Sequence, residues 1–146
     1  MLLNVSPQSN GVIGDDQRSV LLALGEWLDE FGEAIYTSRA YSTYGYGDAD
    51  IGDSAFGDQS STVDYSASDI RYTTSKEGDK IYAMTLGMPT TGTNLNFKYI
   101  EESVSAVSLM GSDVEVKWEQ QGTDIVVRVP DASEMNEYAT VFVLDI

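Results

Sequence analysis

Apolar side chains recur at three- and four-residue spacing between Val20 and Phe31. This spacing places them along one side of a helix. Asp15 and Asp16 stand where acidic side chains favour the positive N-terminal end of a helix, as the N-cap or in the first turn. Gly32 follows the last periodic residue and fits a C-cap. The pattern predicts an amphipathic helix from Asp15 or Asp16 to Phe31.

A short apolar run precedes this helix. Residues 2–5 read Leu-Leu-Asn-Val, a pattern typical of a buried strand. The Ser-Asn-Gly sequence at residues 9–11 then supplies turn chemistry, because Asn and Gly tolerate positive φ. We therefore expect one strand and a turn before the helix.

Alternation with a period of two dominates the second half of the chain. In residues 114–119 every second side chain is apolar, as in a strand with one face in a core. Short runs of this kind are separated by turn clusters such as Lys-Glu-Gly-Asp at residues 76–79. The expected strands are 70–74, 81–86, 94–100, 106–109, 114–119, 125–129 and 138–144. Their spacing predicts a mainly β protein, an antiparallel β-sandwich over residues 65–146.

The stretch between the two halves has neither period. Residues 40–64 are rich in Gly, Ser, Tyr and Asp. Such composition predicts an acidic loop or linker. The expected organisation is therefore an N-terminal strand and helix over 1–39, a linker over 40–64 and the sandwich over 65–146.

Charge narrows the classes of partner. The formal net charge is −16 in 146 residues. Nucleic acids and anionic membranes bind clustered Lys and Arg, so neither is an expected partner. The charge fits a surface that resists aggregation, or an adaptation to salt. No run of eighteen apolar residues is present, and the N-terminus lacks the basic region of a secretory signal, which leaves the compartment open.

Motifs for common cofactors and nucleophiles are absent. The chain has no cysteine and no histidine, so disulfides and thiolate metal sites are excluded. Its glycines punctuate turns and form neither a Walker nor a Rossmann signature. No cofactor is expected.

Two groups within the acidic stretch are candidates for binding. Asp48, Asp50 and Asp53 supply the oxygen ligands that calcium prefers, although the rest of an EF-hand loop is missing. An acidic loop without metal is the alternative. A series of aromatic residues could stack on sugar rings or anchor the loop onto the sandwich. Its members are Tyr41, Tyr44, Tyr46, Phe56 and Tyr65.

Ordered short motifs resemble the α-L-fucosidases of glycoside hydrolase family 29. The helix end reads Leu24-Gly25-Glu26-Trp27-Leu28, and the first sandwich strand reads Ser68-Asp69-Ile70-Arg71-Tyr72-Thr73. Further similar runs are residues 2–7, 10–13, 32–39, 109–112 and 116–118. The resemblance implies the C-terminal part of such an enzyme, with residues 1–39 as the last strand and helix of a (β/α)8 barrel, followed by the C-terminal β-sandwich domain.

The resemblance also has consequences for catalysis. It implies retaining hydrolysis of α-L-fucosides, in a family whose members are often periplasmic, secreted or lysosomal. The family's nucleophile, acid/base and fucose-binding histidines all lie before the matched part, so no catalytic residue is assigned. Two departures stand out: Gly14 replaces a common proline, and the acidic insert is longer than the family's linker.

Three functions follow as expectations. The first is a structural or accessory fragment of an α-L-fucosidase with little or no activity alone. The second is a standalone carbohydrate-binding sandwich that contacts fucosylated glycans through the aromatic series. The third is a homo-oligomer, which could retain residual fucosidase activity, assembled through the N-terminal strand and helix. The self-association candidates are Leu3, Val5, Leu21, Leu24, Trp27 and Leu28.

Overall fold

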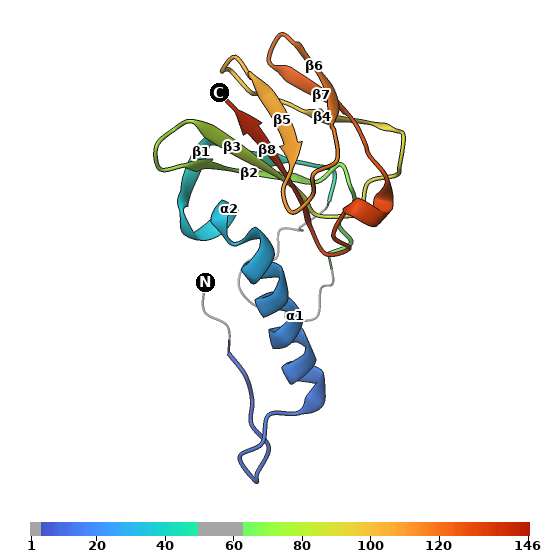
Figure 1. Ribbon diagram of the computed structural model, residues 1–146. Coiled ribbons are helices and arrows are strands. Elements are labelled where there is room, and N and C mark those ends of the chain that lie inside the picture. Colours follow the sequence, from blue (N-terminus) through green and yellow to red (C-terminus); the bar gives the residue numbers. More distant parts are fainter. Residues whose placement is uncertain (1–3, 50–62) are drawn as a thin grey trace.

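Two antiparallel sheets stacked on each other form the body of the molecule (Figure 1). The structure is a computed structural model that describes residues 4–49 and 63–146. The larger sheet has the strand order β1-β2-β3-β8-β5, and the smaller has the order β4-β7-β6. The strands are β1 (Ser38–Tyr46), β2 (Ile70–Ser75), β3 (Lys80–Thr85), β4 (Asn94–Phe97), β5 (Ala106–Leu109), β6 (Lys117–Gln121), β7 (Asp124–Arg128) and β8 (Thr140–Asp145). The predicted β-sandwich is confirmed.

The core lies between the two sheets and follows the alternation in the sequence. On β7, Ile125 and Val127 point inward and are fully buried. The rings of Phe97 and Phe142 meet across the core, with centroids 5.2 Å apart. Each such side chain contributes about 1.5–3 kcal/mol through removal of its apolar surface from water. The sandwich is therefore held by its own interior.

The central strands of the larger sheet are buried on both faces. Five of the six residues of β3, and five of the six of β8, are buried. The outward side chains, Tyr82, Met84, Val141 and Val143, form a second apolar cluster with Phe31 and Ala34. This explains the nearly continuous apolar run of β8, since a strand covered on both faces needs no polar alternation.

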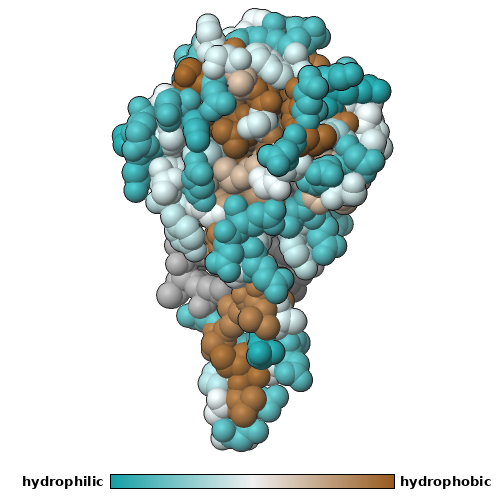
Figure 2. Space-filling view, in the orientation of Figure 1, coloured by the Kyte–Doolittle hydropathy of each residue, from teal (hydrophilic) through white to brown (hydrophobic). Residues whose placement is uncertain are grey.

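The helices cover the outer face of the larger sheet only through α2 (Glu33–Tyr36) and the C-terminal end of α1 (Asp15–Phe31). Helix α1 contains one buried residue, Phe31, and short helix α2 contains one, Ala34. The rest of α1 projects away from the sandwich (Figure 1). Figure 2 shows hydrophobic surface gathered along this projecting part. The third helical element, the 3-10 turn η1 (Ala132–Glu134), precedes β8.

The helix boundaries agree with the prediction, but its N-cap does not. Gly14 is the N-cap and makes no side-chain capping bond, so Asp15 and Asp16 act only as first-turn carboxylates. Gly32 is the C-cap with a right-handed φ of −62°. Because Gly32 is not in the left-handed conformation that usually ends a helix, the chain continues directly into α2.

The predicted loop over 40–64 was wrong for residues 40–46, which belong to β1. Polar residues on this edge strand hide its alternation, in which Tyr41 is buried and its neighbours are not. The pairing with β2 shifts between Ala40 and Gly45. A Cβ at Gly45 would lie 2.1 Å from the Ile70 carbonyl oxygen, so only glycine fits.

Other strand boundaries also differ from the prediction; the strand expected over 138–144, for example, runs from Thr140 to Asp145. The strand expected over 114–119 starts at Lys117, and the one expected over 94–100 ends at Phe97. Tyr99 has a φ of +65°, which breaks extended backbone. Of the strand expected over 2–5, the described residues Asn4 and Val5 have no regular structure. The ladder contact in this region is an isolated bridge between Pro7 and Ile13.

A buried carboxylate joins the two ends of the acidic segment. Asp69 is 1% exposed. Its Oδ1 accepts a hydrogen bond from the Ala49 N–H at 2.9 Å, and its Oδ2 accepts from the Ser66 N–H at 2.7 Å and the Ser66 hydroxyl at 2.8 Å. These bonds satisfy the buried charge and fix residues 49 and 66 next to β2.

Candidate functional site

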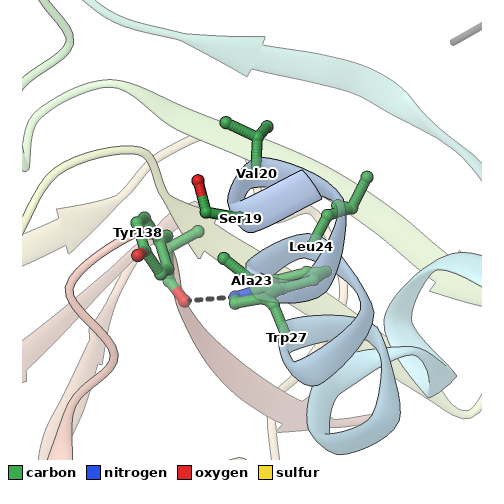
Figure 3. Close-up of a pocket in the computed structure, with 7 residues that line it drawn as sticks. Ser19, Val20, Ala23, Leu24, Trp27 and Tyr138 are labelled. Carbon is green, nitrogen blue, oxygen red and sulfur yellow. Dashed lines mark hydrogen bonds between the residues drawn. The ribbon is translucent and has the colours of Figure 1, made fainter. Parts of the chain in front are cut away.

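A hollow lies on the side of α1 rather than within the sandwich. Its volume is about 470 Å³. Figure 3 shows Ser19, Val20, Leu24 and Trp27 on α1, with Tyr138 beside the helix; all five line the hollow. Ala23 and Ala139 complete the lining. We call this hollow the α1 groove; its walls are almost entirely apolar.

Trp27 fixes one wall of the α1 groove against the sandwich. Its indole N–H donates a hydrogen bond to the Ala139 carbonyl oxygen at 2.9 Å (Figure 3). Its ring contacts Phe31, with a centroid separation of 5.3 Å. Two turns before Trp27 on α1, Val20 is 63% exposed. The groove is therefore fixed to the sandwich at Trp27 and open to solvent toward the N-terminus of α1.

A second hollow of about 300 Å³ continues from the first. Val20 lines both, and Val5, Gln17 and Leu21 line the second. Gln17 ties the preceding segment to α1, since the Ser6 N–H donates to its Oε1 at 2.8 Å. Asn4 and Asp16 complete the lining of the second hollow, so the two hollows form one surface along the helix that is apolar over the first hollow and mixed over the second.

Some of the predicted self-association residues line these hollows and others do not. Val5, Leu21, Leu24 and Trp27 line this continuous surface. Leu28 is half-buried and lines neither hollow. Leu3 lies outside the described residues. The sequence missed Tyr138 and Ala139, the far wall, because they belong to a turn before β8 rather than to the helical pattern.

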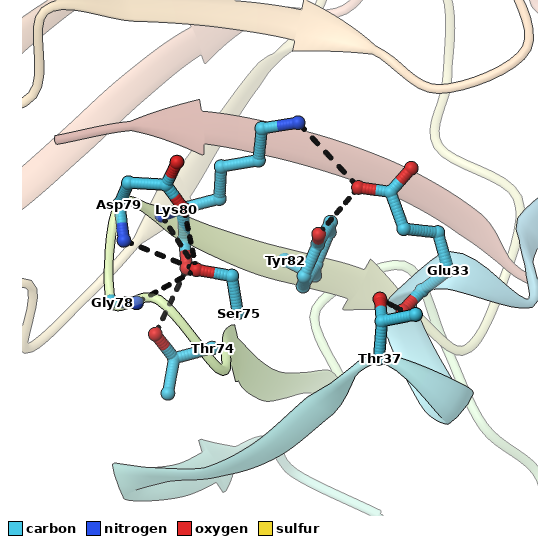
Figure 4. Close-up of polar contacts among 8 residues, drawn as sticks. All are labelled: Glu33, Thr37, Thr74, Ser75, Gly78, Asp79, Lys80 and Tyr82. Atoms are coloured by element: carbon cyan, nitrogen blue, oxygen red, sulfur yellow. Dashed lines mark hydrogen bonds and ion pairs between the residues drawn. The ribbon is translucent and has the colours of Figure 1, made fainter.

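Polar contacts attach α2 to the sheet (Figure 4). The Tyr82 hydroxyl donates to Glu33 Oε1 at 2.6 Å, and Lys80 lies 3.5 Å from the same oxygen. The Tyr82 hydrogen bond, with help from Lys80, holds the pKa of Glu33 below its usual range, against the effect of burial. On the neighbouring strand, the Thr73 hydroxyl donates to the Ala34 carbonyl oxygen at 2.7 Å. These contacts set the direction in which α1 leaves the sandwich.

Two of the aromatic candidates serve as anchors. Tyr41 is 8% exposed, and its hydroxyl donates to Glu102 Oε2 at 2.5 Å. Burial and this carboxylate raise the pKa of Tyr41 to about 12. Tyr46 is half-buried and its hydroxyl donates to the Asn96 carbonyl oxygen. Both rings connect β1 to the core.

Two other candidates present their rings to solvent. Tyr44 is 74% exposed and Tyr65 is 43% exposed. The Arg71 guanidinium carbon lies 5.9 Å from the centroid of the first ring and 6.0 Å from that of the second. Phe56, the remaining aromatic candidate, lies outside the described residues. Sequence reasoning did not single out Arg71, although a charged residue between Ile70 and Tyr72 signals an outward position on a strand.

The acidic metal candidates stay a prediction. Asp48 is exposed just after β1, whereas Asp50 and Asp53 lie outside the described residues. Over residues 4–49 and 63–146, no three acidic side chains gather as a metal site would require. In the same part of the chain, no helix is long and apolar enough to cross a membrane.

Comparison with known families identifies the sandwich. Residues 63–146 match the family described as the Alpha-L-fucosidase C-terminal domain, and this is more than half of the chain. The chain belongs to this family. The predicted resemblance is therefore confirmed for residues 63–146, which carry the far wall of the groove and Tyr65.

Similarity extends from this fucosidase C-terminal domain to the helical segment. The tissue α-L-fucosidase of Bos taurus is 28% identical over 143 residues, which is 94% of this chain and 26% of the bovine protein. The Homo sapiens tissue α-L-fucosidase is 28% identical over 118 residues, 80% of this chain and 21% of the human protein. The chain thus spans about a quarter of the length of these relatives.

Solved structures also match nearly the whole of this chain and less than a third of the matched protein. A Thermotoga maritima α-fucosidase in complex with a mechanism-based inhibitor superposes with a TM-score of 0.73 at 25% identity. The match covers 99% of this chain and 30% of that protein. The α-L-fucosidase isoenzyme 1 of Paenibacillus thiaminolyticus has the same fold, with a TM-score of 0.68, 23% identity and coverage of 99% and 30%. Helix α1 is therefore included in the matched fold, together with the fucosidase C-terminal domain.

Proposed function

We propose that these 146 residues act as the non-catalytic C-terminal part of an α-L-fucosidase, and that α1 joins the sandwich to the catalytic portion of such an enzyme. The family supports the enzyme class. The observation that carries the role of α1 is the apolar groove along it. An exposed apolar groove on a chain with a net charge of −16 calls for a covering partner.

The size of the relatives supports a catalytic portion as that partner. The matched fold includes α1 and forms 30% of the Thermotoga maritima enzyme. Most of that enzyme therefore lies beyond the matched part. A helix with one buried residue in seventeen has the apolar side that such a neighbouring portion would cover.

The chain alone should have little or no activity. A retaining glycosidase needs two carboxyl groups about 5 Å apart within a sugar pocket. The α1 groove is lined by Ser, Val, Ala, Leu, Trp and Tyr and contains no carboxylate. We therefore assign it to packing rather than to bond cleavage.

An aryl α-L-fucoside assay tests this proposal. The chain should release no aryl alcohol, while the Thermotoga maritima α-fucosidase, assayed in parallel, should release it. Sustained turnover that scales with the concentration of this chain would contradict the proposal, and turnover only in self-associated fractions would favour a site rebuilt between copies.

A second copy of the chain is the other candidate occupant, favoured by exposed Val5 and Val20 along the same surface. Light scattering decides this question. If copies associate, the mass should rise with salt, because screening weakens their repulsion. The Leu24→Gln variant should then return the mass to that of a monomer, whereas Leu22→Gln, on an exposed residue outside both hollows, should not. A monomeric mass at every salt concentration would reject self-association.

A further inference from the structure

Tyr44, Arg71 and Tyr65 form a compact surface group that the packing of the sandwich does not require. The two rings are 74% and 43% exposed. Tyr41 and Tyr46, by contrast, direct their hydroxyl groups to fixed acceptors. We call the three residues the Tyr–Arg–Tyr patch. Among the aromatic candidates within residues 4–49 and 63–146, its two tyrosines are the ones whose rings stay accessible.

The guanidinium of this patch is held in place by the backbone. Arg71 Nη1 donates to the Ile70 carbonyl oxygen at 2.8 Å and to the Tyr46 carbonyl oxygen at 3.3 Å. A guanidinium carries five N–H donors in a planar fork. Within the described residues both hydrogen bonds of the guanidinium leave from Nη1. A fixed donor group between two aromatic rings is thus prepared before any ligand arrives.

The register of the sheet places this patch on the outer face. Arg71 pairs with Met84, which belongs to the outer apolar cluster. Two residues further along β2, Thr73 donates to α2 on that same face. The Tyr–Arg–Tyr patch therefore lies on the side of the sandwich from which α1 emerges, where the proposed function puts the catalytic portion.

We infer that the Tyr–Arg–Tyr patch binds an uncharged sugar ring, and that this ring belongs to the fucosylated glycan on which the enzyme acts. The identity of the glycan rests on the proposed function. The C–H groups of a pyranose ring carry partial positive charge and stack on the negative face of an aromatic ring. The guanidinium N–H groups donate to the sugar hydroxyl groups, which accept them.

Charge selects a neutral ring over an acidic one. The chain carries 24 acidic and 8 basic residues, so its field repels anionic ligands. Arg71 alone would attract an anion, but Asp69, two residues away and held as a carboxylate, offsets its charge. A neutral sugar experiences neither effect. The patch is thus a subsite that holds a neutral glycan ring.

NMR titration of the 146-residue chain tests the inference directly. The probe is methyl α-L-fucopyranoside, with methyl α-D-glucuronide as the charged comparison. The aromatic resonances of Tyr44 and Tyr65 should shift with the fucoside. Those of Tyr36, which is 65% exposed on α2, should not. The glucuronide should produce smaller shifts at equal concentration.

Three variants measure the contribution of each part. Tyr44→Ala and Tyr65→Ala should each weaken fucoside binding about three- to tenfold, the range of a single aromatic contact. Arg71→Lys keeps the charge but loses the planar fork, so it should weaken binding by a similar factor. Tyr36→Ala is the matched control and should leave the affinity unchanged.

Absence of shifts at Tyr44 and Tyr65 in the unmodified chain would overturn the inference, and so would equal shifts at Tyr36. Shifts that occur only with a fucosidase catalytic portion and without sugar would reassign the patch to a protein contact. The aryl fucoside assay is independent of these results. Turnover by the chain alone would reject the proposed function while leaving the sugar contact to the NMR data.

Discussion

The sandwich and helix α1 solve the problem of apolar surface in opposite ways. In β3 five of six residues are buried, whereas α1 buries one of seventeen. The strands cover each other and receive α2 and the end of α1 on the outer face. The N-terminal part of α1 keeps its apolar side exposed. The contrast teaches that the sandwich covers its apolar surface internally, whereas the proposed binding role of α1 rests on apolar surface that stays exposed.

The largest expected effect comes from the interior of the sandwich. Phe142 is fully buried against Phe97, so Phe142→Ala should lower the free energy of unfolding by about 3–5 kcal/mol. Chemical denaturation measures the loss. Leu22→Ala on α1, where Leu22 is 49% exposed, is the control and should change stability far less. Similar losses for both variants would remove the contrast between the two regions.

Asp69 should give the next largest effect. Burial alone would raise its pKa, but the hydrogen bonds from Ser66 and Ala49 and the charge of Arg71 hold that pKa below its usual range. Asp69→Asn should therefore lower the free energy of unfolding by about 1–3 kcal/mol at pH 7. Denaturation of the exposed-site variant Asp113→Asn provides the comparison.

The pH dependence of this effect has a defined sign. Because the folded state lowers the pKa of Asp69, its carboxylate stabilises the fold above the unfolded pKa of about 3.9. That contribution is lost as the pH falls through the folded pKa. The stability difference between the original chain and Asp69→Asn should shrink below about pH 4. A difference that stays constant down to pH 2 would show that the charge is not responsible.

A smaller effect should follow at the junction of the two regions. Trp27→Phe removes the indole N–H that binds the Ala139 carbonyl oxygen, and should cost about 1 kcal/mol. Hydrogen exchange should show faster opening of α1 with the strands of the sandwich unchanged. Uniformly faster exchange would mean that α1 and the sandwich unfold as one unit.

The smallest effect is expected on the open part of α1. Val20 is 63% exposed, so Val20→Ala should change the free energy of unfolding by at most about 0.5 kcal/mol. Thermal denaturation checks this value. A loss above about 1 kcal/mol would mean that this surface is already covered in solution.

The sequence predicted those elements that bury a regular apolar face and missed an edge strand that does not. Helix α1 was predictable because Leu24, Trp27 and Phe31 keep a helical period, and β7 because Ile125 and Val127 alternate. Strand β1 was missed because an edge strand rich in Ser, Thr and Tyr carries little apolar signal, and its bulge interrupts the alternation. Local patterns report burial against a core and are weak where a strand is half exposed.

The candidate sites were harder to predict for a different reason. The sequence placed Leu24 and Trp27 on an apolar surface, but the opposite wall at Tyr138 comes from a segment more than 100 residues away. Likewise, Tyr44 and Tyr65 differ from Tyr41 only through their neighbours in space, such as Arg71. Composition identified the aromatic candidates, and the tertiary fold separated anchors from exposed rings.

Asp69 binds residues on both sides of the acidic segment with its two carboxylate oxygens. The length of that segment can therefore change with little effect on the sandwich. The N–H groups of residues 49 and 66 bind the two oxygens of one carboxylate, so the ends of any intervening chain meet at the same point. Doubling the length of such a closed segment costs only about 0.6 kcal/mol of closure entropy. Insertions or reporter peptides placed between these residues should therefore leave the sandwich intact, which makes this position a natural entry point for grafting.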